Sequence, residues 1–214
     1  MTRTKVKICG LKTPDTIDAA IEAGADYVGL VFFEPSSRNL SLALAARLAA
    51  HVAKRAKIVA LMVDPDDALV TSVARAITPD LIQLHGSETP ARAAAIAKLS
   101  GTPIMKAIKV ETAADAQVAL DYNGIAALIL FDAKPPKGAL LPGGNGVPFD
   151  WQALEGVSRK VDFMLSGGLT PENVAEAIRL TGAPAVDVSS GVESSPGVKD
   201  AARIRAFIAA AIAV

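Results

Sequence analysis

The sequence has few of the residues that hold metals or cross-link a chain. Its 214 residues include one cysteine, Cys9, and two histidines, His51 and His85. A single cysteine cannot form an intramolecular disulfide, and two histidines without metal-ligand spacing do not supply a zinc cage. We therefore expect a protein of a reducing compartment, the cytoplasm, with no bound metal.

The sequence also lacks an excess of charge of either sign. Its 22 basic and 22 acidic residues give a formal net charge of zero, and the pI is near 6.7. Such a chain has no overall positive field for nucleic acid or an anionic membrane, so an anion site has to be built locally. We expect no nucleic-acid partner.

No apolar run is long enough to cross a bilayer. The longest near an end, 206–214, has nine residues, whereas a spanning helix needs roughly 20. The first residues run into Val6 without the apolar core of a secretory signal. We expect neither a signal peptide nor a membrane partner.

What the sequence does contain is a regular alternation of short apolar runs with Ala-rich amphipathic stretches. The intervals between successive runs, 22 to 35 residues, suit a strand, a helix and two turns. Thr13-Pro14 and Thr170-Pro171 are typical helix openings. The eight predicted strands begin near Lys5, Tyr27, Lys57, Leu81, Ile104, Ala127, Asp162 and Ala185.

Continuous alternation of strands and helices predicts a parallel sheet covered by helices. A doubly wound sheet usually has five or six strands and, when it holds a dinucleotide, a Gly-rich fingerprint after the first; residues 9–12 read CGLK. Eight units favour a single (β/α)8 barrel domain over residues 1–214, with function at the C-terminal ends of the strands. A chain of this length buries roughly 70% of its unfolded surface in one core.

One connection is much longer than the others. Residues 133–149, between Asp132 and Asp150, are rich in Pro and Gly and have no helical period. A linker to another domain has a similar composition. Because the strand-helix pattern resumes in register afterwards, we interpret the segment as an active-site loop after the sixth strand.

Glycine-rich segments follow the last two predicted strands, at Gly167-Gly168 and at Ser190-Gly191. Each alone is more typical of a tight turn. Together, at the two strands where barrel enzymes frequently bind phosphate with backbone N–H groups, they predict a phosphate site. Glycine matters because a side chain would keep the phosphate away from the amides.

Reactive and charged side chains stand at the other strand ends. Cys9 ends the first strand; a lone cysteine is often a buried hydrophobe, and a base role needs ionisation or concerted proton removal. Asp132 follows an apolar run that favours its protonated form, as an acid requires. Arg38 either binds a substrate carboxylate or is a solvated loop cation. His85 either lines the site or is a structural histidine, and Asp187 is a further carboxylate at a strand end.

Five segments together resemble phosphoribosylanthranilate isomerases over nearly the whole chain. They are Lys7-Ile8-Cys9-Gly10-Leu11, Gln83-Leu84-His85-Gly86, residues 143–151, Leu165-Ser166-Gly167-Gly168-Leu169, and residues 186–193. The resemblance implies a cofactor-free Amadori rearrangement in tryptophan biosynthesis, in which N-(5-phosphoribosyl)anthranilate becomes 1-(2-carboxyphenylamino)-1-deoxyribulose 5-phosphate. The partner is thus a small phosphorylated aminosugar.

The resemblance also implies roles for the strand-end residues. Asp132 becomes the general acid that protonates the furanose oxygen, and Cys9 the base that removes the C2 proton. Arg38 faces the anthranilate carboxylate, and His85 and Asp187 line the pocket. The phosphate is assigned to the backbone around Gly167, Gly168, Ser190 and Gly191.

The sequence departs from the family at Val147-Pro148, Asn39 and Asp64, which concerns contacts of loop side chains with the substrate rather than the acid-base pair. An indole-glycerol-phosphate synthase is the enzyme alternative. That chemistry uses catalytic lysines and extra N-terminal helices, whereas here the first predicted strand ends in Cys9 and is preceded by only four residues. A sugar-phosphate sensor is the non-enzymatic alternative. Whether the chain is a monomer or a weak homodimer, and whether the histidine-pathway aminoaldose is accepted, stay open.

Overall fold

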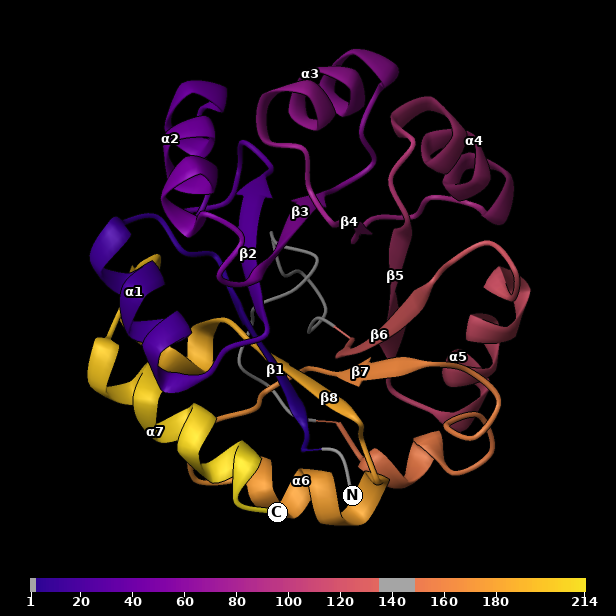
Figure 1. Cartoon of the computed structure of the whole chain (residues 1–214). Coiled ribbons are helices and arrows are strands. Elements are labelled where there is room, and N and C mark those ends of the chain that lie inside the picture. The colour runs from indigo at the N-terminus through magenta and orange to yellow at the C-terminus, as the bar shows by residue number, and fades with distance from the viewer. Residues whose placement is uncertain (1–2, 135–148) are drawn as a thin grey trace.

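Eight parallel strands close into a barrel in which each strand pairs with its neighbours along the chain and the eighth pairs with the first (Figure 1). The computed structural model describes residues 3–134 and 149–214. The strands are β1 (Lys5–Cys9), β2 (Tyr27–Phe32), β3 (Lys57–Met62), β4 (Leu81–Leu84), β5 (Ile104–Val110), β6 (Leu128–Ala133), β7 (Phe163–Leu165) and β8 (Ala185–Val188). The predicted (β/α)8 fold is confirmed.

Helices form a ring outside the barrel and cover its outer face (Figure 1). They are α1 (Pro14–Ala23), α2 (Leu42–Val52), α3 (Asp67–Ile77), α4 (Pro90–Ser100), α5 (Ala113–Gln117), α6 (Val174–Thr181) and α7 (Ala201–Ile212). Short 3-10 turns are η1 (Val118–Tyr122), η2 (Trp151–Leu154) and η3 (Ser190–Val192). A two-stranded antiparallel ribbon of β9 (Glu193–Ser195) and β10 (Val198–Lys199) joins β8 to α7.

Most strand boundaries agree with the sequence. Six strands begin at the predicted residue, while β6 and β7 begin one residue later, at Leu128 and Phe163. The predicted helix opening at Thr13-Pro14 is confirmed, with the Thr13 side chain accepting the Thr16 N–H. The opening predicted at Thr170-Pro171 is wrong by one turn. The Asn173 side chain accepts the Thr170 N–H at 2.8 Å, which folds 170–173 into a turn, and α6 begins at Val174.

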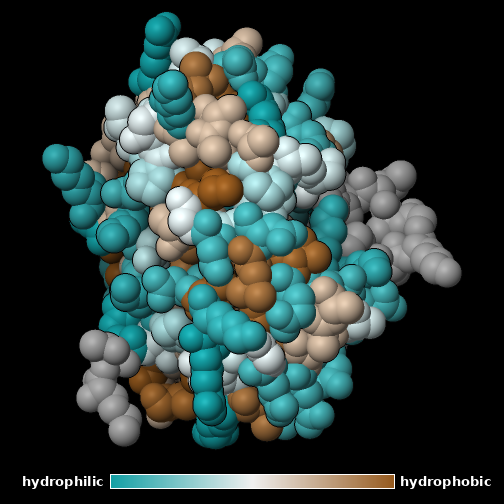
Figure 2. Space-filling model, turned by 90° about the vertical axis from the view of Figure 1, so that its right-hand side faces the viewer, coloured by the Kyte–Doolittle hydropathy of each residue, from teal (hydrophilic) through white to brown (hydrophobic). Residues whose placement is uncertain are grey.

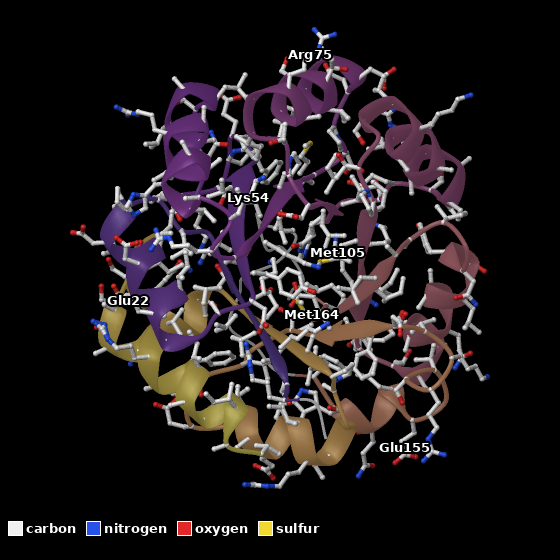
Figure 3. The ribbon with its side chains drawn as sticks, viewed as in Figure 1. Glu22, Lys54, Arg75, Met105, Glu155 and Met164 are labelled. Atoms are coloured by element: carbon white, nitrogen blue, oxygen red, sulfur yellow. The ribbon has the colours of Figure 1, made fainter. Side chains whose placement is uncertain are left out.

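The apolar residues form two separate cores. A large outer core lies between the sheet and the helices and includes one face of α7, formed by Ile204, Phe207, Ile208 and Ala211, all fully buried. A smaller core fills the barrel itself and includes Met105 and Met164, which lie near its centre in Figure 3. Its other buried members are Tyr27, Val59, Ala107, Leu130 and Ala185.

The barrel core identifies which residues of each strand point inward. Successive side chains of a strand alternate between faces, so a residue two or four positions after an inward one also points inward. Tyr27, Leu130 and Ala185 therefore place Gly29, Asp132 and Asp187 on the inner face. The inner face is apolar in the middle and polar toward the C-terminal ends of the strands.

The outer surface carries hydrophobic residues in small separate patches among hydrophilic ones on the face drawn in Figure 2. The longest helix in the described part of the chain is α7, with 12 residues, and no described helix is both long and apolar enough to cross a bilayer.

Candidate active site

Cys9 and Asp132 lie at the same end of the barrel, on two strands that are separated by two others. Cys9 is the last residue of β1, and Asp132 is the fifth of six residues in β6, which is separated from β1 by β7 and β8. Both side chains are on the inner face and nearly buried. Gly29 of β2 makes room for the thiol, because a Cβ there would lie 3.0 Å from Cys9 Sγ.

A buried ion pair lies directly below the thiol. Lys7 Nζ donates to Asp187 Oδ1 at 2.8 Å, and the Ser166 hydroxyl donates to Asp187 Oδ2 at 3.1 Å. Lys7 and Asp187 are register partners on β1 and β8. The structure thus brings the predicted Asp187 to the inner face, where its carboxylate is held by Lys7 and Ser166.

Burial raises the pKa of the Cys9 thiol, because the thiolate loses solvation inside the barrel. The Lys7 ammonium opposes this shift, and the Asp187 carboxylate adds to it. The pKa of Lys7 is itself raised, because the attraction of Asp187 outweighs the effect of burial. Cys9 is therefore a neutral thiol at rest, and Lys7 is the cation that can favour its ionised form.

Asp132 is joined to His85 and Gln83 in a buried row. His85 Nε2 lies 3.1 Å from Asp132 Oδ2, and Gln83 Nε2 lies 2.9 Å from His85 Nδ1. Asp132 Oδ1 accepts the N–H of Ala133 at 3.0 Å. The predicted acid and the predicted pocket histidine are thus in direct contact.

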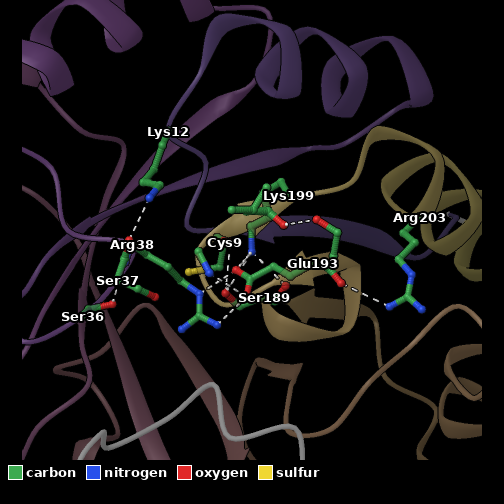
Figure 4. A network of polar contacts seen from close by, with 12 residues as sticks. Cys9, Lys12, Ser36, Ser37, Arg38, Ser189, Glu193, Lys199 and Arg203 are labelled. Atoms are coloured by element: carbon green, nitrogen blue, oxygen red, sulfur yellow. Dashed lines mark hydrogen bonds and ion pairs between the residues drawn. The ribbon is translucent and has the colours of Figure 1, made fainter.

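Arg38 is engaged by a buried carboxylate rather than standing free. Its Nε donates to Glu193 Oε1 at 2.7 Å and its Nη2 to Glu193 Oε2 at 2.8 Å (Figure 4). Glu193 also accepts from Lys199 Nζ at 2.7 Å. Burial alone would raise the pKa of Glu193, but Arg38 and Lys199 together lower it to about 2.

The same network reaches the strand that carries the thiol. Lys199 Nζ donates to the Ser189 carbonyl at 2.8 Å, and the Ser189 hydroxyl donates to the Cys9 carbonyl at 3.1 Å. Figure 4 shows these side chains converging from β1, the loop after β2 and the segment after β8. Arg38 and Cys9 are therefore held on one connected set of contacts.

The four residues predicted to bind phosphate lie in adjacent loops. Gly167 and Gly168 follow β7 with positive φ angles of 88° and 65°, and Ser190 and Gly191 begin η3 after β8. An added Cβ at Gly167 would collide with the Ala133 backbone, and one at Gly191 with the Leu169 carbonyl oxygen. Only glycine allows these loops to approach so closely.

Four residues of the site were not assigned roles from the sequence. They are Lys7, Gln83, Glu193 and Lys199, all of them polar and buried or nearly so. Lys7 stands between Val6 and Ile8 in a buried strand, and a charge in such a position is a detectable sign of an internal ion pair. The partners of Glu193 depend on the β9–β10 ribbon, which the sequence does not indicate. Residues 135–148 of the predicted loop, with Val147-Pro148, lie outside the described residues.

The fold and the site define a class of protein: a (β/α)8-barrel enzyme with a buried thiol, a buried carboxyl group and glycine-rich loops at the C-terminal ends of its strands. Within residues 3–134 and 149–214, no cluster of three or more His, Cys, Asp or Glu side chains is placed to hold a metal ion.

Comparison with known proteins identifies the family. Residues 6–210 match the family model of N-(5'-phosphoribosyl)anthranilate (PRA) isomerase. The curated enzyme of that name from Paramagnetospirillum magneticum is 56% identical over 207 residues, which cover 97% of this chain and 96% of the relative. That from Rhodopseudomonas palustris (strain HaA2) is 56% identical over 205 residues, covering 96% of this chain and 94% of the relative.

Solved structures agree. Phosphoribosyl anthranilate isomerase from Thermotoga maritima superposes with a TM-score of 0.89 at 34% identity, covering 99% of this chain and 100% of that one. A second isomerase structure, solved with reduced 1-(o-carboxyphenylamino)-1-deoxyribulose 5-phosphate, has a TM-score of 0.86 at 33% identity with the same coverage. The chain belongs to the phosphoribosylanthranilate isomerase family, and its activity is that isomerisation in tryptophan biosynthesis.

Proposed function

We propose that Cys9 and Asp132 are the base and the acid of this isomerisation. The observation that carries the proposal is their placement at one mouth of the barrel, on strands separated by two others, both on the inner face and both buried. A sugar between them would be reached from two sides. General acid-base catalysis needs groups in such positions and contributes about 10² to 10⁴ in rate.

The reaction divides into two proton transfers. Asp132 gives a proton to the furanose ring oxygen, the C1–O bond breaks, and the ring opens to an iminium ion. The cationic nitrogen acidifies the C2 proton, which Cys9 removes, and the C2–H electrons form the enolamine. Tautomerisation of the enolamine then gives the aminoketose. The chemistry therefore needs an acid, a base and the substrate's own nitrogen.

The resting thiol must lose its proton before or during the second transfer. The Lys7 ammonium supports the thiolate, while burial and Asp187 oppose it, as the raised pKa of Cys9 reflects. The iminium adds a second positive charge next to the reacting carbon. We propose that proton removal by Cys9 is coupled to the presence of this cation.

The remaining predicted residues bind the two anionic ends of the substrate. Arg38 uses Nε and Nη2 for Glu193, which leaves Nη1 without a partner in the described part of the chain and available for the anthranilate carboxylate. Backbone N–H groups around Gly167, Gly168, Ser190 and Gly191 would hold the phosphate. His85 and Asp187 act through their contacts with Asp132 and Lys7.

The fluorescence of the anthranilate group provides the test. Cys9→Ala and Asp132→Asn should each lower kcat by about 10² or more with little change in ligand binding. Lys54→Met is the control, because this exposed residue lies between α2 and β3, at the N-terminal end of the strands and away from the site. Turnover close to wild type in either site variant would remove the role assigned to that residue. Ligand binding without turnover in the wild type would instead indicate a sugar-phosphate sensor.

We also propose a small phosphorylated aminosugar as substrate, a cytoplasmic location, and a monomer or weak homodimer. The substrate class is supported by the phosphosugar bound in the related structure. The location is supported by the biosynthetic activity of the family and by the single thiol, which suits a reducing compartment.

A further inference from the structure

Gln83 is a fully buried amide of which only the nitrogen is hydrogen-bonded in the described part of the protein. Its Nε2 faces His85 Nδ1 at 2.9 Å, but its Oε1 has no partner in the described part of the protein. Leaving a buried polar atom unpaired costs about 1–3 kcal/mol, and native proteins contain few such atoms. The position of this one, two contacts from Asp132, suggests a functional reason.

The row of Gln83, His85 and Asp132 can hold its protons in two ways. In the first, the Gln83 amide NH₂ donates to His85 Nδ1, and His85 Nε2–H donates to an ionised Asp132. In the second, the amide is turned by half a rotation, so that Oε1 accepts from His85 Nδ1–H. A further proton then lies between His85 Nε2 and Asp132 Oδ2. The second arrangement carries one proton more than the first.

A terminal amide is suited to both arrangements because it offers a donor and an acceptor in nearly the same shape. A carboxylate would support only the proton-loaded state, and an apolar side chain would support neither. The orphan oxygen of Gln83 is thus the acceptor that the loaded state uses.

Building on the proposed function, we propose that Gln83 is a positioning residue that allows His85 and Asp132 to hold the acid proton together. Asp132 delivers this proton to the ring oxygen, while Gln83 Oε1 holds the Nδ1 proton of His85 in place until Asp132 is protonated again. The C2 hydroxyl releases one proton when the ketone forms, which can return to Asp132. Protons therefore balance over one turnover without an external acid.

Some of the charged groups around the row are engaged in contacts of their own. Lys106 is paired with Glu88 at 2.7 Å, and Asp64 accepts the Ser87 N–H at 2.7 Å. The register partner of Asp132 on β5 is Lys109. The charged or titratable groups on the surrounding strands and loops are Lys7, Cys9, Asp64, Glu88, Lys106, Lys109, Lys134 and Asp187. Changing Gln83 therefore alters the charge next to His85 directly.

Two variants at position 83 should move the pH dependence of kcat in opposite directions. Gln83→Glu places an anion against His85 and should shift the alkaline limb of the kcat–pH profile to higher pH, by about one pH unit or more. Gln83→Met, of similar shape but without an acceptor, should shift it downward. A merely structural role would lower kcat in both variants without moving the limb, and that result would overturn the inference.

A second measurement does not depend on these variants. The chain has two histidines, so His51→Gln leaves His85 alone for nitrogen NMR of the ring. We expect Nδ1 of His85 to gain a proton as the pH is lowered through the alkaline limb, the range in which kcat rises. A ring protonated only at Nε2 throughout that range would contradict the inference. If Asp132→Asn retains activity, the proposed acid is wrong. If Asp132→Asn is inactive but the alkaline limb of kcat does not move in the Gln83 variants, only the role of Gln83 is wrong.

Discussion

Arg38 and Glu193 are joined by two parallel hydrogen bonds of 2.7 and 2.8 Å inside the mouth of the barrel. The planar guanidinium and the carboxylate match in this arrangement, which fixes the Arg38 side chain in one orientation. Gly10 adds to the constraint, since a Cβ there would lie 2.6 Å from Arg38 Cδ. Arg38 is therefore presented to the site already positioned.

Removing either member of this pair should weaken substrate binding more than chemistry. Arg38→Ala loses the contact to the anthranilate carboxylate and should raise KM by about tenfold to a hundredfold, the range of a charge-assisted hydrogen bond. Glu193→Gln should raise KM less, because Arg38 remains but is less well oriented. Steady-state kinetics with the anthranilate adduct measures both.

A variant that combines Arg38→Ala with Glu193→Gln tests whether Glu193 acts on substrate binding through Arg38. If it does, Arg38→Ala with Glu193→Gln should have the KM of Arg38→Ala alone, because the two changes remove one interaction. Additive effects would mean that Glu193 serves the substrate independently. An unchanged KM in Arg38→Ala would contradict the carboxylate contact itself.

The titration of Cys9 should depend on the ion pair below it. Lys7→Met removes the cation that favours the thiolate, so the pKa of the thiol should rise further. Asp187→Asn removes the opposing anion and should lower it. The chain has one cysteine, so the pH dependence of alkylation, or of thiolate absorbance, reports this group alone.

Stability has to be controlled in that experiment. Breaking a buried ion pair on one side costs about 3–5 kcal/mol, so each variant needs an unfolding curve. Lys5→Met, at the exposed start of the same strand, is the control that removes a charge from β1 without touching the pair. An alkylation midpoint that stays unchanged in Lys7→Met would show that Lys7 does not influence the thiol.

The fold was largely readable from the sequence because the barrel repeats one local pattern eight times. Period-2 and helical patterns are local, so the strand starts came within one residue throughout. The error at Thr170-Pro171 arose where a side-chain contact, Asn173 to the Thr170 N–H, competed with helix formation. The local sequence pattern does not show whether the side-chain contact or the first turn of the helix is the more stable.

The site was predictable in position but not in connectivity. Strand ends identified Cys9, Asp132 and the glycine segments, because parallel strands bring their C-terminal ends together. The pairing of Arg38 with Glu193 joins residues 155 positions apart, and Lys7 with Asp187 joins residues 180 apart. No rule of sequence spacing predicts contacts between residues so far apart in the chain, so these ion pairs could be identified only from the structure.

The contact between the two glycine loops should be essential for phosphate binding. Gly191→Ala puts a methyl group against the Leu169 carbonyl oxygen, which forces η3 away from the loop after β7 and separates the two sets of N–H groups. We expect KM and the inhibition constant of inorganic phosphate to rise by about tenfold or more, with kcat changed less. Gly182→Ala is the control: its φ of 64° is unsuited to a side chain, but no atom lies within 4 Å, so it should cost about 1 kcal/mol of stability and leave KM unchanged. If Gly191→Ala lost only stability, as Gly182→Ala should, the phosphate would have to bind elsewhere.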